Sequence, residues 1–143
     1  MICAECERKH RLGATDEPVP RRHEQREAEE QTALFRWSEM CDKREELRLM
    51  FHVPNGGSRN RLEAANLKRQ GVKAGVPDIF LPVARGGFHG LFVEMKAEGG
   101  RLSEKQEEWL ADLHAQGYAV KVAYGWEEAR KAIEAYLGMG AIV

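Results

Sequence analysis

Two short segments of this chain carry the side chains whose types and spacing could do chemistry. Asp78 stands at the start of the apolar run Ile79-Phe80-Leu81. Sixteen residues later, Glu94 and Lys96 follow a second run, Leu91-Phe92-Val93. Because successive side chains of a strand point to opposite faces, Glu94 and Lys96 must share one face. If the two runs pair as a hairpin, Asp78 joins them.

Two carboxylates and one ammonium group at a single point indicate a site for a divalent cation. Mg²⁺ prefers near-octahedral oxygen coordination and takes one or two carboxylates, while water and substrate phosphate fill its other positions. Asp78 and Glu94 fit that preference, and the backbone carbonyl of Met95 could supply a further oxygen. Lys96 could orient or deprotonate an attacking water, or neutralise charge that develops on a phosphate.

The same residues have simpler interpretations. Asp78 could be an ordinary acid in a turn after Pro77, and Glu94 with Lys96 could be a charge pair on an exposed strand. The apolar residues before Glu94 favour a central strand instead. His52 and His89 have no partner that the sequence reveals, and we interpret both as structural.

A further acid could come from the first helix. Between Ala33 and Cys41, apolar residues recur at three- and four-residue spacing, which is typical of an amphipathic helix. Glu30 lies on this stripe one turn before Leu34, where an acid is unusual unless something pairs with it. We therefore expect Glu30 to reach the site as a further metal-binding or water-bridging carboxylate. Alternatively, the acids from Glu24 to Glu30 form a solvated helix start that the macrodipole favours.

A basic segment precedes Asp78. Residues 59–73 hold five basic side chains and one acid. We expect a helix from Arg59 to Gln70 that Gly71 ends. Its place before Asp78 favours contacts with nucleic-acid phosphates over an ordinary solvated helix, so binding should weaken steeply with salt. The candidate DNA-binding residues are Asn55, Arg59, Lys68, Arg69 and Lys73.

The elements that must position these residues alternate in type. Ser103 and Gln106 form a capping box at a helix start, which we expect beside the strand end that carries Lys96. We expect helices from about residue 24 to 41, at 59–70, 103–116 and 126–137, and strands at 49–53, 78–83, 91–96 and 118–124, with a glycine turn at 85–90. This order, αβαββαβα, predicts an α/β fold with a central mixed β-sheet flanked by helices on both faces.

The size of the chain suits one domain, because 143 residues can bury one real core. Its net charge of −1 does not exclude nucleic acid, since binding depends on where the charge lies. No apolar run is long enough to span a membrane, and the N-terminus lacks an apolar signal region. Three cysteines are too few for a disulfide framework. We therefore expect a cytoplasmic protein.

Residues 1–22 are polar, contain proline and lack an apolar period, so we expect a disordered tail before a domain over 23–143. Within the tail, Cys3, Cys6 and His10 have the spacing of half a zinc site, with His23 as a distant fourth ligand. Cysteines that occur by chance in a tail are the alternative, which we favour.

At these residues the chain resembles the VRR-NUC branch of the PD-(D/E)xK nucleases, which have a restriction-endonuclease-like fold. The resemblance extends from about residue 27 to 137. Its strings are Asn55-Gly56-Gly57-x-Arg59, Gly71-Val72-Lys73-x-Gly75-Val76-Pro77-Asp78, Glu94-x-Lys96, Gly100-Arg101-Leu102-Ser103-x-x-Gln106 and Trp109. A lone Pro-Asp with a distant Glu-x-Lys is common by chance, whereas the full ordered series is specific.

The resemblance implies a phosphodiesterase that acts on DNA with Mg²⁺ or Mn²⁺. Asp78, Glu94 and Lys96 would be its catalytic core, and Gln106 its supporting polar residue. The helix acid of the family maps best to Glu30, and Glu27, one turn earlier, is the alternative.

Stand-alone members resemble homodimeric Holliday-junction resolvases, which function in DNA repair and recombination. We therefore expect a bacterial or phage-encoded endonuclease that cleaves branched DNA as a homodimer. One alternative is a less selective phage or prophage nuclease that acts on duplex ends or nicks. Another is a non-catalytic DNA-binding module, against which the intact Asp78, Glu94 and Lys96 argue.

Overall fold

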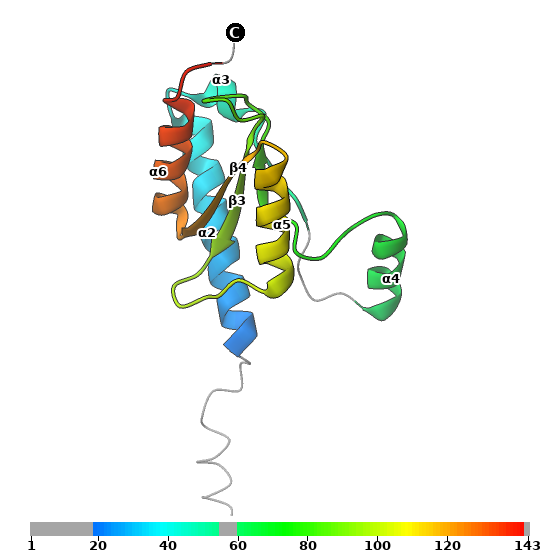
Figure 1. The fold of residues 1–143 in the computed structure, drawn as a ribbon. Helices are drawn as coiled ribbons and strands as arrows, with labels where there is room; N and C mark the ends of the chain where they lie inside the picture. Colours follow the sequence, from blue (N-terminus) through cyan, green and yellow to red (C-terminus); the bar gives the residue numbers. More distant parts are fainter. Residues whose placement is uncertain (1–18, 55–59, 142–143) are drawn as a thin grey trace, which may run out of the picture.

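A mixed four-stranded sheet lies between two layers of helices in the computed structural model, which describes residues 19–54 and 60–141 (Figure 1). The strand order is β1-β2-β3-β4. In chain order the elements are α2 (Val19–Met40), α3 (Arg44–Leu47), β1 (Phe51–His52), α4 (Arg61–Arg69), β2 (Ile79–Leu81), β3 (Leu91–Lys96), α5 (Glu104–Ala115), β4 (Ala119–Tyr124) and α6 (Trp126–Leu137). The predicted α/β class and the predicted order of the main elements are confirmed.

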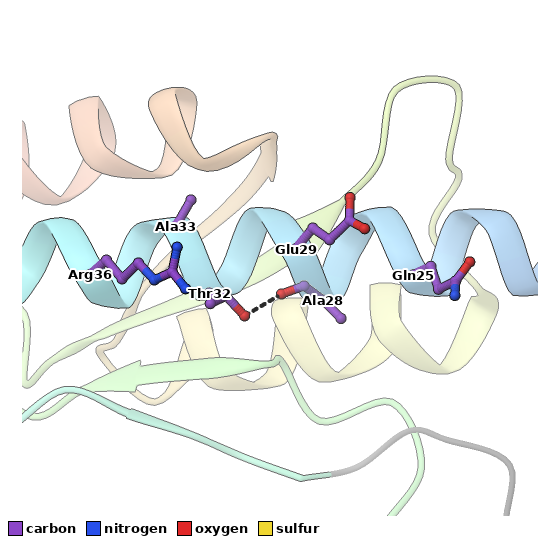
Figure 2. A pocket seen from close by; sticks show the side chains of 6 residues that line it. All are labelled: Gln25, Ala28, Glu29, Thr32, Ala33 and Arg36. Carbon is purple, nitrogen blue, oxygen red and sulfur yellow. Dashed lines mark hydrogen bonds between the residues drawn. The ribbon is translucent and has the colours of Figure 1, made fainter.

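Helix α2 separates a buried face from a solvent face. Leu34 and Ser38 are buried, four residues apart as the helical period requires. The opposite side is exposed and forms a shallow hollow of about 430 Å³, within which the Thr32 hydroxyl donates a hydrogen bond of 2.8 Å to the Ala28 carbonyl (Figure 2). Glu27 and Glu30 are half-buried, so both lie away from the fully exposed face.

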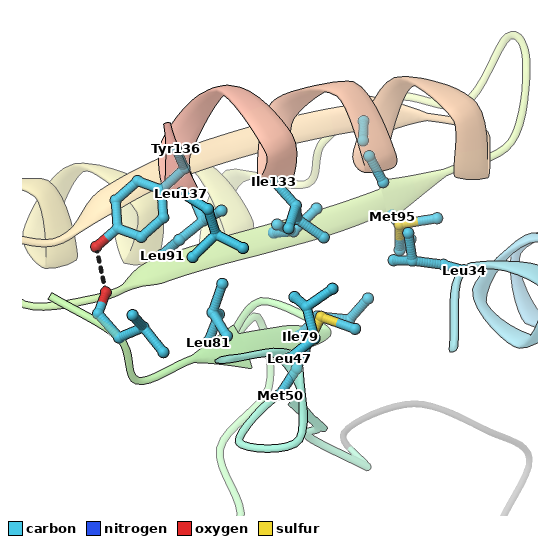
Figure 3. Close-up of a cluster of buried hydrophobic side chains, with 14 residues drawn as sticks. Leu34, Leu47, Met50, Ile79, Leu81, Leu91, Met95, Ile133, Tyr136 and Leu137 are labelled. Carbon is cyan, nitrogen blue, oxygen red and sulfur yellow. Dashed lines mark hydrogen bonds between the residues drawn. The ribbon is translucent and has the colours of Figure 1, made fainter. Parts of the chain in front are cut away.

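The hydrophobic core fills the space between the sheet and the helices α2 and α6 (Figure 3). Alternate residues of β2 and β3 point into it, and Ile133, Tyr136 and Leu137 of α6 meet them there. The Tyr136 hydroxyl donates a hydrogen bond of 2.6 Å to the Val83 carbonyl (Figure 3). Helix α5 packs against β4 on the other side of the sheet (Figure 1).

Strand β3 is the central element of the sheet. It pairs with β2 in antiparallel fashion and with β4 in parallel, and all six of its residues are buried. Leu91, Val93 and Met95 belong to the hydrophobic core. Because side chains alternate along a strand, Glu94 and Lys96 lie on the opposite face, where they are only 2% and 8% exposed.

Several elements differ from the prediction in their bounds or were not predicted. Helix α2 begins at Val19, earlier than the expected helix start near residue 24; Pro20 is tolerated there because the first N–H groups of a helix have no intrahelical acceptor. Strand β1 has only two residues, and the short helix α3 was not predicted. The expected zinc ligands Cys3, Cys6 and His10 lie outside the described residues.

The glycine turn before β3 is confirmed. Arg85 and Phe88 exchange backbone hydrogen bonds, and the two glycines between them have φ angles of 59° and 85°. Positive φ at both central positions is the requirement of a type I′ turn, which glycine meets without strain. None of the helices in 19–54 and 60–141 has the length and hydropathy of a membrane-spanning segment.

Candidate active site

The pairing of β2 with β3 brings Asp78 and Glu94 together. Ile79 lies opposite Val93, so the preceding residue, Asp78, falls beside Glu94. The Met95 backbone N–H donates a hydrogen bond of 2.8 Å to Asp78 Oδ2. The hairpin arrangement expected from the sequence therefore exists, and it places both carboxyl groups on the sheet face opposite the core.

Glu94 is held through only one of its two oxygens. Its Oε1 accepts a hydrogen bond of 2.6 Å from Gln106 Nε2 and lies 3.5 Å from Lys96 Nζ. Its Oε2 is buried without a hydrogen-bond partner among the described residues. A buried carboxylate oxygen without a donor costs free energy, so this side of the site favours added positive charge.

Gln106 both caps helix α5 and holds Glu94. Its Oε1 accepts a hydrogen bond of 2.9 Å from Ser103 N, and its own N–H donates to the Ser103 hydroxyl at 3.2 Å. This capping box fixes the side-chain amide, whose Nε2 is then directed at Glu94. Gln106 thus contacts both the start of its own helix and Glu94.

Burial perturbs both carboxyl groups, and repulsion by Asp78 adds to the effect on Glu94. Burial, together with the negative charge of Asp78, raises the pKa of Glu94 to about 8, although Lys96 opposes the shift. Burial also raises the pKa of Asp78, against the Met95 N–H bond and the charges of His52 and Lys96. Two carboxylates at one desolvated point are costly to ionise together, so the site is short of positive charge.

The structure brings Glu27, rather than Glu30, to this cluster. Glu27 Oε1 accepts a hydrogen bond of 3.3 Å from Ala97 N, directly after β3. Burial raises the pKa of Glu27, while the charge of Lys96 lowers it and that of Asp78 raises it. The alternative assignment of the helix acid is thus the one that the geometry supports.

Glu30, the helix acid favoured from the sequence, is engaged elsewhere in the structure. Its Oε2 accepts a hydrogen bond of 2.7 Å from the backbone N–H of Trp126, the first residue of α6. It therefore satisfies one of the free donors at a helix N-terminus, which is a capping function. Glu27 and Glu30 are three residues apart on one side of α2, so the helical period could not separate them.

His52 is a neighbour of the site that the sequence did not indicate. Its Nδ1 lies 2.8 Å from the Asp78 carbonyl oxygen and must carry the proton, because a carbonyl only accepts. The Val53 N–H donates to the same oxygen at 2.7 Å. The pairing of β1 with β2 could have signalled this contact, but a two-residue strand is too short to be placed from sequence.

The predicted basic helix forms an arm. Helix α4 projects from the body on the side of the sheet that α5 covers, and none of its residues is buried (Figure 1). A hydrogen bond of 3.2 Å from Trp109 Nε1 to the Ala74 carbonyl holds the base of the arm against α5. Lys68, Arg69 and Lys73 are exposed on it. Asn55 and Arg59 lie outside the described residues.

Arg61 adds to the charge of this arm. Arg61 and Lys68 are seven residues apart in α4, so they share one side of the helix. The Asn60 side chain caps the helix by accepting a hydrogen bond of 2.8 Å from Glu63 N. The sequence placed Arg61 in the basic segment but did not single it out.

Two surface hollows of the described residues lie away from the carboxylate pair. One is the hollow on the outer side of α2 (Figure 2). Another, of about 510 Å³, adjoins the end of β3 and is lined by Arg26, Glu29, Glu30, Ala97, Glu98, Tyr124 and Gly125. Neither of these two hollows is lined by Asp78, Glu94 or Lys96.

The fold and the comparisons with known proteins together define a nuclease-type domain. The chain belongs to the VRR-NUC family, because the model of the VRR-NUC domain matches residues 13–127. A solved structure described as a VRR_NUC domain protein is 34% identical in sequence, with a TM-score of 0.70. That similarity covers 81% of this chain and 91% of the other. No curated protein matches the chain.

The pKa of Glu94 predicts how stability depends on pH in buffer that contains EDTA. The folded state binds the Glu94 proton more tightly than the unfolded state, whose pKa is near 4.5. Stability is thus fully present below that pKa and is lost as pH rises toward 8. We expect the free energy of unfolding to fall by more than about 1 kcal/mol between about pH 5 and pH 8, and Glu94→Gln to flatten this dependence.

Urea denaturation at several pH values measures this effect. Glu98→Gln is the matched control, because Glu98 is exposed close to the end of β3 and should leave the pH dependence unchanged. Equal slopes for the wild type and Glu94→Gln would contradict the raised pKa of Glu94.

Proposed function

We propose that this chain is a divalent-cation-dependent DNA endonuclease that hydrolyses phosphodiester bonds with Asp78, Glu94 and Lys96. The observation that carries the proposal is the buried carboxylate pair beside Lys96, with Glu94 Oε2 left without a partner. A purely structural role would not require two carboxyl groups to be buried side by side, because burying apolar residues of similar size costs less free energy than burying two charges.

The residues present fit a divalent cation of the Mg²⁺ or Mn²⁺ type. Asp78 and Glu94 offer hard oxygen donors, and the unpartnered Glu94 Oε2 is the kind of atom that such an ion satisfies. No three His, Cys, Asp or Glu side chains in 19–54 and 60–141 gather closely enough to hold a metal without further ligands. The proposed ligands are therefore the two carboxylates and the Met95 carbonyl, completed by water and phosphate oxygens.

When bound, the ion supplies polarisation of the scissile phosphate and acidification of water. The side chains supply orientation. Gln106 holds Glu94 in place through Oε1, and Lys96 stabilises negative charge that develops on the phosphate and orients the attacking water. Glu27, beside Lys96, is the proposed further carboxylate of the site in place of Glu30.

The α4 arm supports DNA as the substrate. Its exposed cations lie in the segment that leads directly into Asp78, and its backbone is anchored to α5 next to the site. We propose that Arg61, Lys68, Arg69 and Lys73 contact the phosphate backbone, together with Asn55 and Arg59. Contacts of this kind position DNA without reading its sequence.

Branched DNA cleaved by a homodimer is the version of this function that we propose. A two-fold dimer presents two equivalent sites, which suits symmetric cleavage of two strands at a junction. A less selective nuclease on duplex ends or nicks and a DNA-binding module without catalysis are the alternatives. A cleavage panel separates the three.

Asp78→Ala should abolish cleavage while DNA binding remains, because the arm is unchanged. The panel contains labelled four-way junction, flap, nicked and linear DNA with Mg²⁺ or Mn²⁺, and Lys96→Ala serves as a second inactive variant. Preference for the junction supports the homodimeric resolvase version, whereas equal cleavage of linear ends supports the less selective nuclease. A wild-type protein that binds all these DNAs and cuts none would contradict the enzyme.

Glu27→Gln and Glu30→Gln form a matched pair that tests the helix acid. We expect Glu27→Gln to lower kcat by about tenfold or more, because a charge beside Lys96 and Asp78 is lost. Glu30→Gln should keep kcat within about threefold, because an amide oxygen can still accept from Trp126 N. Cleavage rates at saturating DNA, with thermal melting as a check on folding, decide between them. The opposite ranking would restore Glu30 as the catalytic acid.

Removing cations from the arm should weaken binding without base specificity. We expect Arg61→Ala and Lys68→Ala each to reduce the slope of log K against log salt concentration by about 0.9 for each lost phosphate contact. Fluorescence anisotropy with a labelled duplex measures this. Lys131→Ala, in an exposed position of α6, is the control and should bind like the wild type. Unchanged slopes for both arm variants would remove the arm from the DNA interface.

A further inference from the structure

An aromatic row crosses the sheet beside the carboxylate pair. Phe51 of β1 lies opposite Phe80 of β2, and Phe80 lies opposite Phe92 of β3. Directly opposite residues share a face of a sheet, so all three rings lie on the face that also carries Glu94 and Lys96. None of the three rings takes part in the proposed reaction.

The rings form a continuous contact. Phe80 and Phe92 stack with centroids 4.2 Å apart, and Phe51 meets Phe80 edge to face at 5.7 Å. Tyr118 closes the inner end, 5.3 Å from Phe92 and 5.8 Å from Phe80. The exposure increases outward, from 9% at Phe92 to 49% at Phe51. The outer end of the row therefore presents an aromatic surface to solvent.

This row is continuous with the proposed active site. Phe80 follows Asp78 by two residues, and Phe92 precedes Glu94 by two residues. Two residues of a strand span about 7 Å, which equals roughly two stacked nucleotides of one DNA strand. A nucleotide close to the scissile phosphate can thus reach the row.

The charge of the surroundings favours a nucleic acid over a second copy of the chain. The basic arm leaves the sheet after β1 and returns to it before β2, so both of its ends meet the sheet at Asp78, where Val53 N donates to the Asp78 carbonyl. The catalytic carboxylates consequently lie between the attachment of the cationic arm and the row of rings, an arrangement that offers contacts for phosphates on one side and a contact for a base on the other. Of the three phenylalanines in the row, Phe51 alone is exposed, whereas a stable protein interface needs about 800 Å² from each partner.

We propose that the exposed ring of Phe51 is a stacking site for an unpaired DNA base next to the scissile phosphate. Stacking on an aromatic ring requires a free base face, which a base inside an intact duplex does not offer. Phe51 would then favour substrates with unpaired bases beside the cut, such as junctions and flaps. The inference rests on the proposed nuclease function and adds a source of its selectivity.

A double-mutant cycle between the ring and the base tests the proposal. Two forked DNAs are compared, one with normal unpaired nucleotides beside the branch and one with abasic sites at the same positions. We expect wild-type protein to bind the normal fork about tenfold more tightly than the abasic one, and Phe51→Ala to bind both equally. Anisotropy in EDTA measures binding in the absence of cleavage.

Two variants control the cycle. Phe51→Trp keeps an aromatic face and should retain the preference for the normal fork. Leu49→Ala removes another exposed apolar side chain, which lies outside β1 and should also retain the preference. Thermal melting reports whether Phe51→Ala is folded. If it is not, Phe51→Ser replaces it in the test, and the same loss of preference for the normal fork is expected.

Two outcomes overturn the proposal. One is an equal preference for the normal fork in the wild type and in the folded Phe51 variant. The other is a dimer that dissociates in Phe51→Ala by analytical ultracentrifugation, which would make this surface an interface between two copies of the chain. If the wild type cleaves DNA but either outcome is found, only the stacking proposal fails and the nuclease function stands. If the wild type cleaves none of the DNAs, the nuclease function itself is contradicted.

Discussion

The candidate site depends on placing two carboxyl groups side by side in a buried part of the sheet. The hydrogen bond from Met95 N to Asp78 Oδ2 links the start of β2 to the central strand β3, which is buried over its full length. Burial of a charge costs several kcal/mol unless it is paired and hydrogen-bonded. Lys96 and Gln106 compensate Glu94 at one oxygen only, so the folded protein retains a demand for positive charge at the other.

Helix starts supply much of the support for this arrangement. The N-terminus of α5 is fixed by the capping box of Ser103 and Gln106, which directs an amide donor at Glu94. Glu30 satisfies the N-terminus of α6, and Glu27 bonds to the backbone directly after β3. Free N–H groups at these positions require acceptors, and polar side chains near the site meet that requirement while they hold their own positions. The side chains near the site are thus held in place by their hydrogen bonds to backbone N–H groups.

Hydrophobic period and turn chemistry predicted much of the fold. Strand β3 and helix α6 have the expected bounds, because each combines a strong apolar pattern with a clear stop signal. The two-residue strand β1 and the helix α3 were beyond this reasoning, since short elements owe their geometry to their neighbours. The contact of His52 with Asp78 follows from the same pairing and was equally hidden. The outward course of the α4 arm was also beyond this reasoning, because none of the residues of α4 is buried against the rest of the domain.

The sequence alone determined the pair Asp78 and Glu94 with Lys96, because alternation along a strand and a hairpin turn leave few other arrangements. It also identified Gln106, because a capping box is a local motif. Tertiary structure decided which helix acid approaches the pair. Glu27 and Glu30 lie three residues apart on one side of α2, so local periodicity treats them alike. Only the packing of α2 against the sheet and α6 gives Glu27 the end of β3 and Glu30 the first turn of α6.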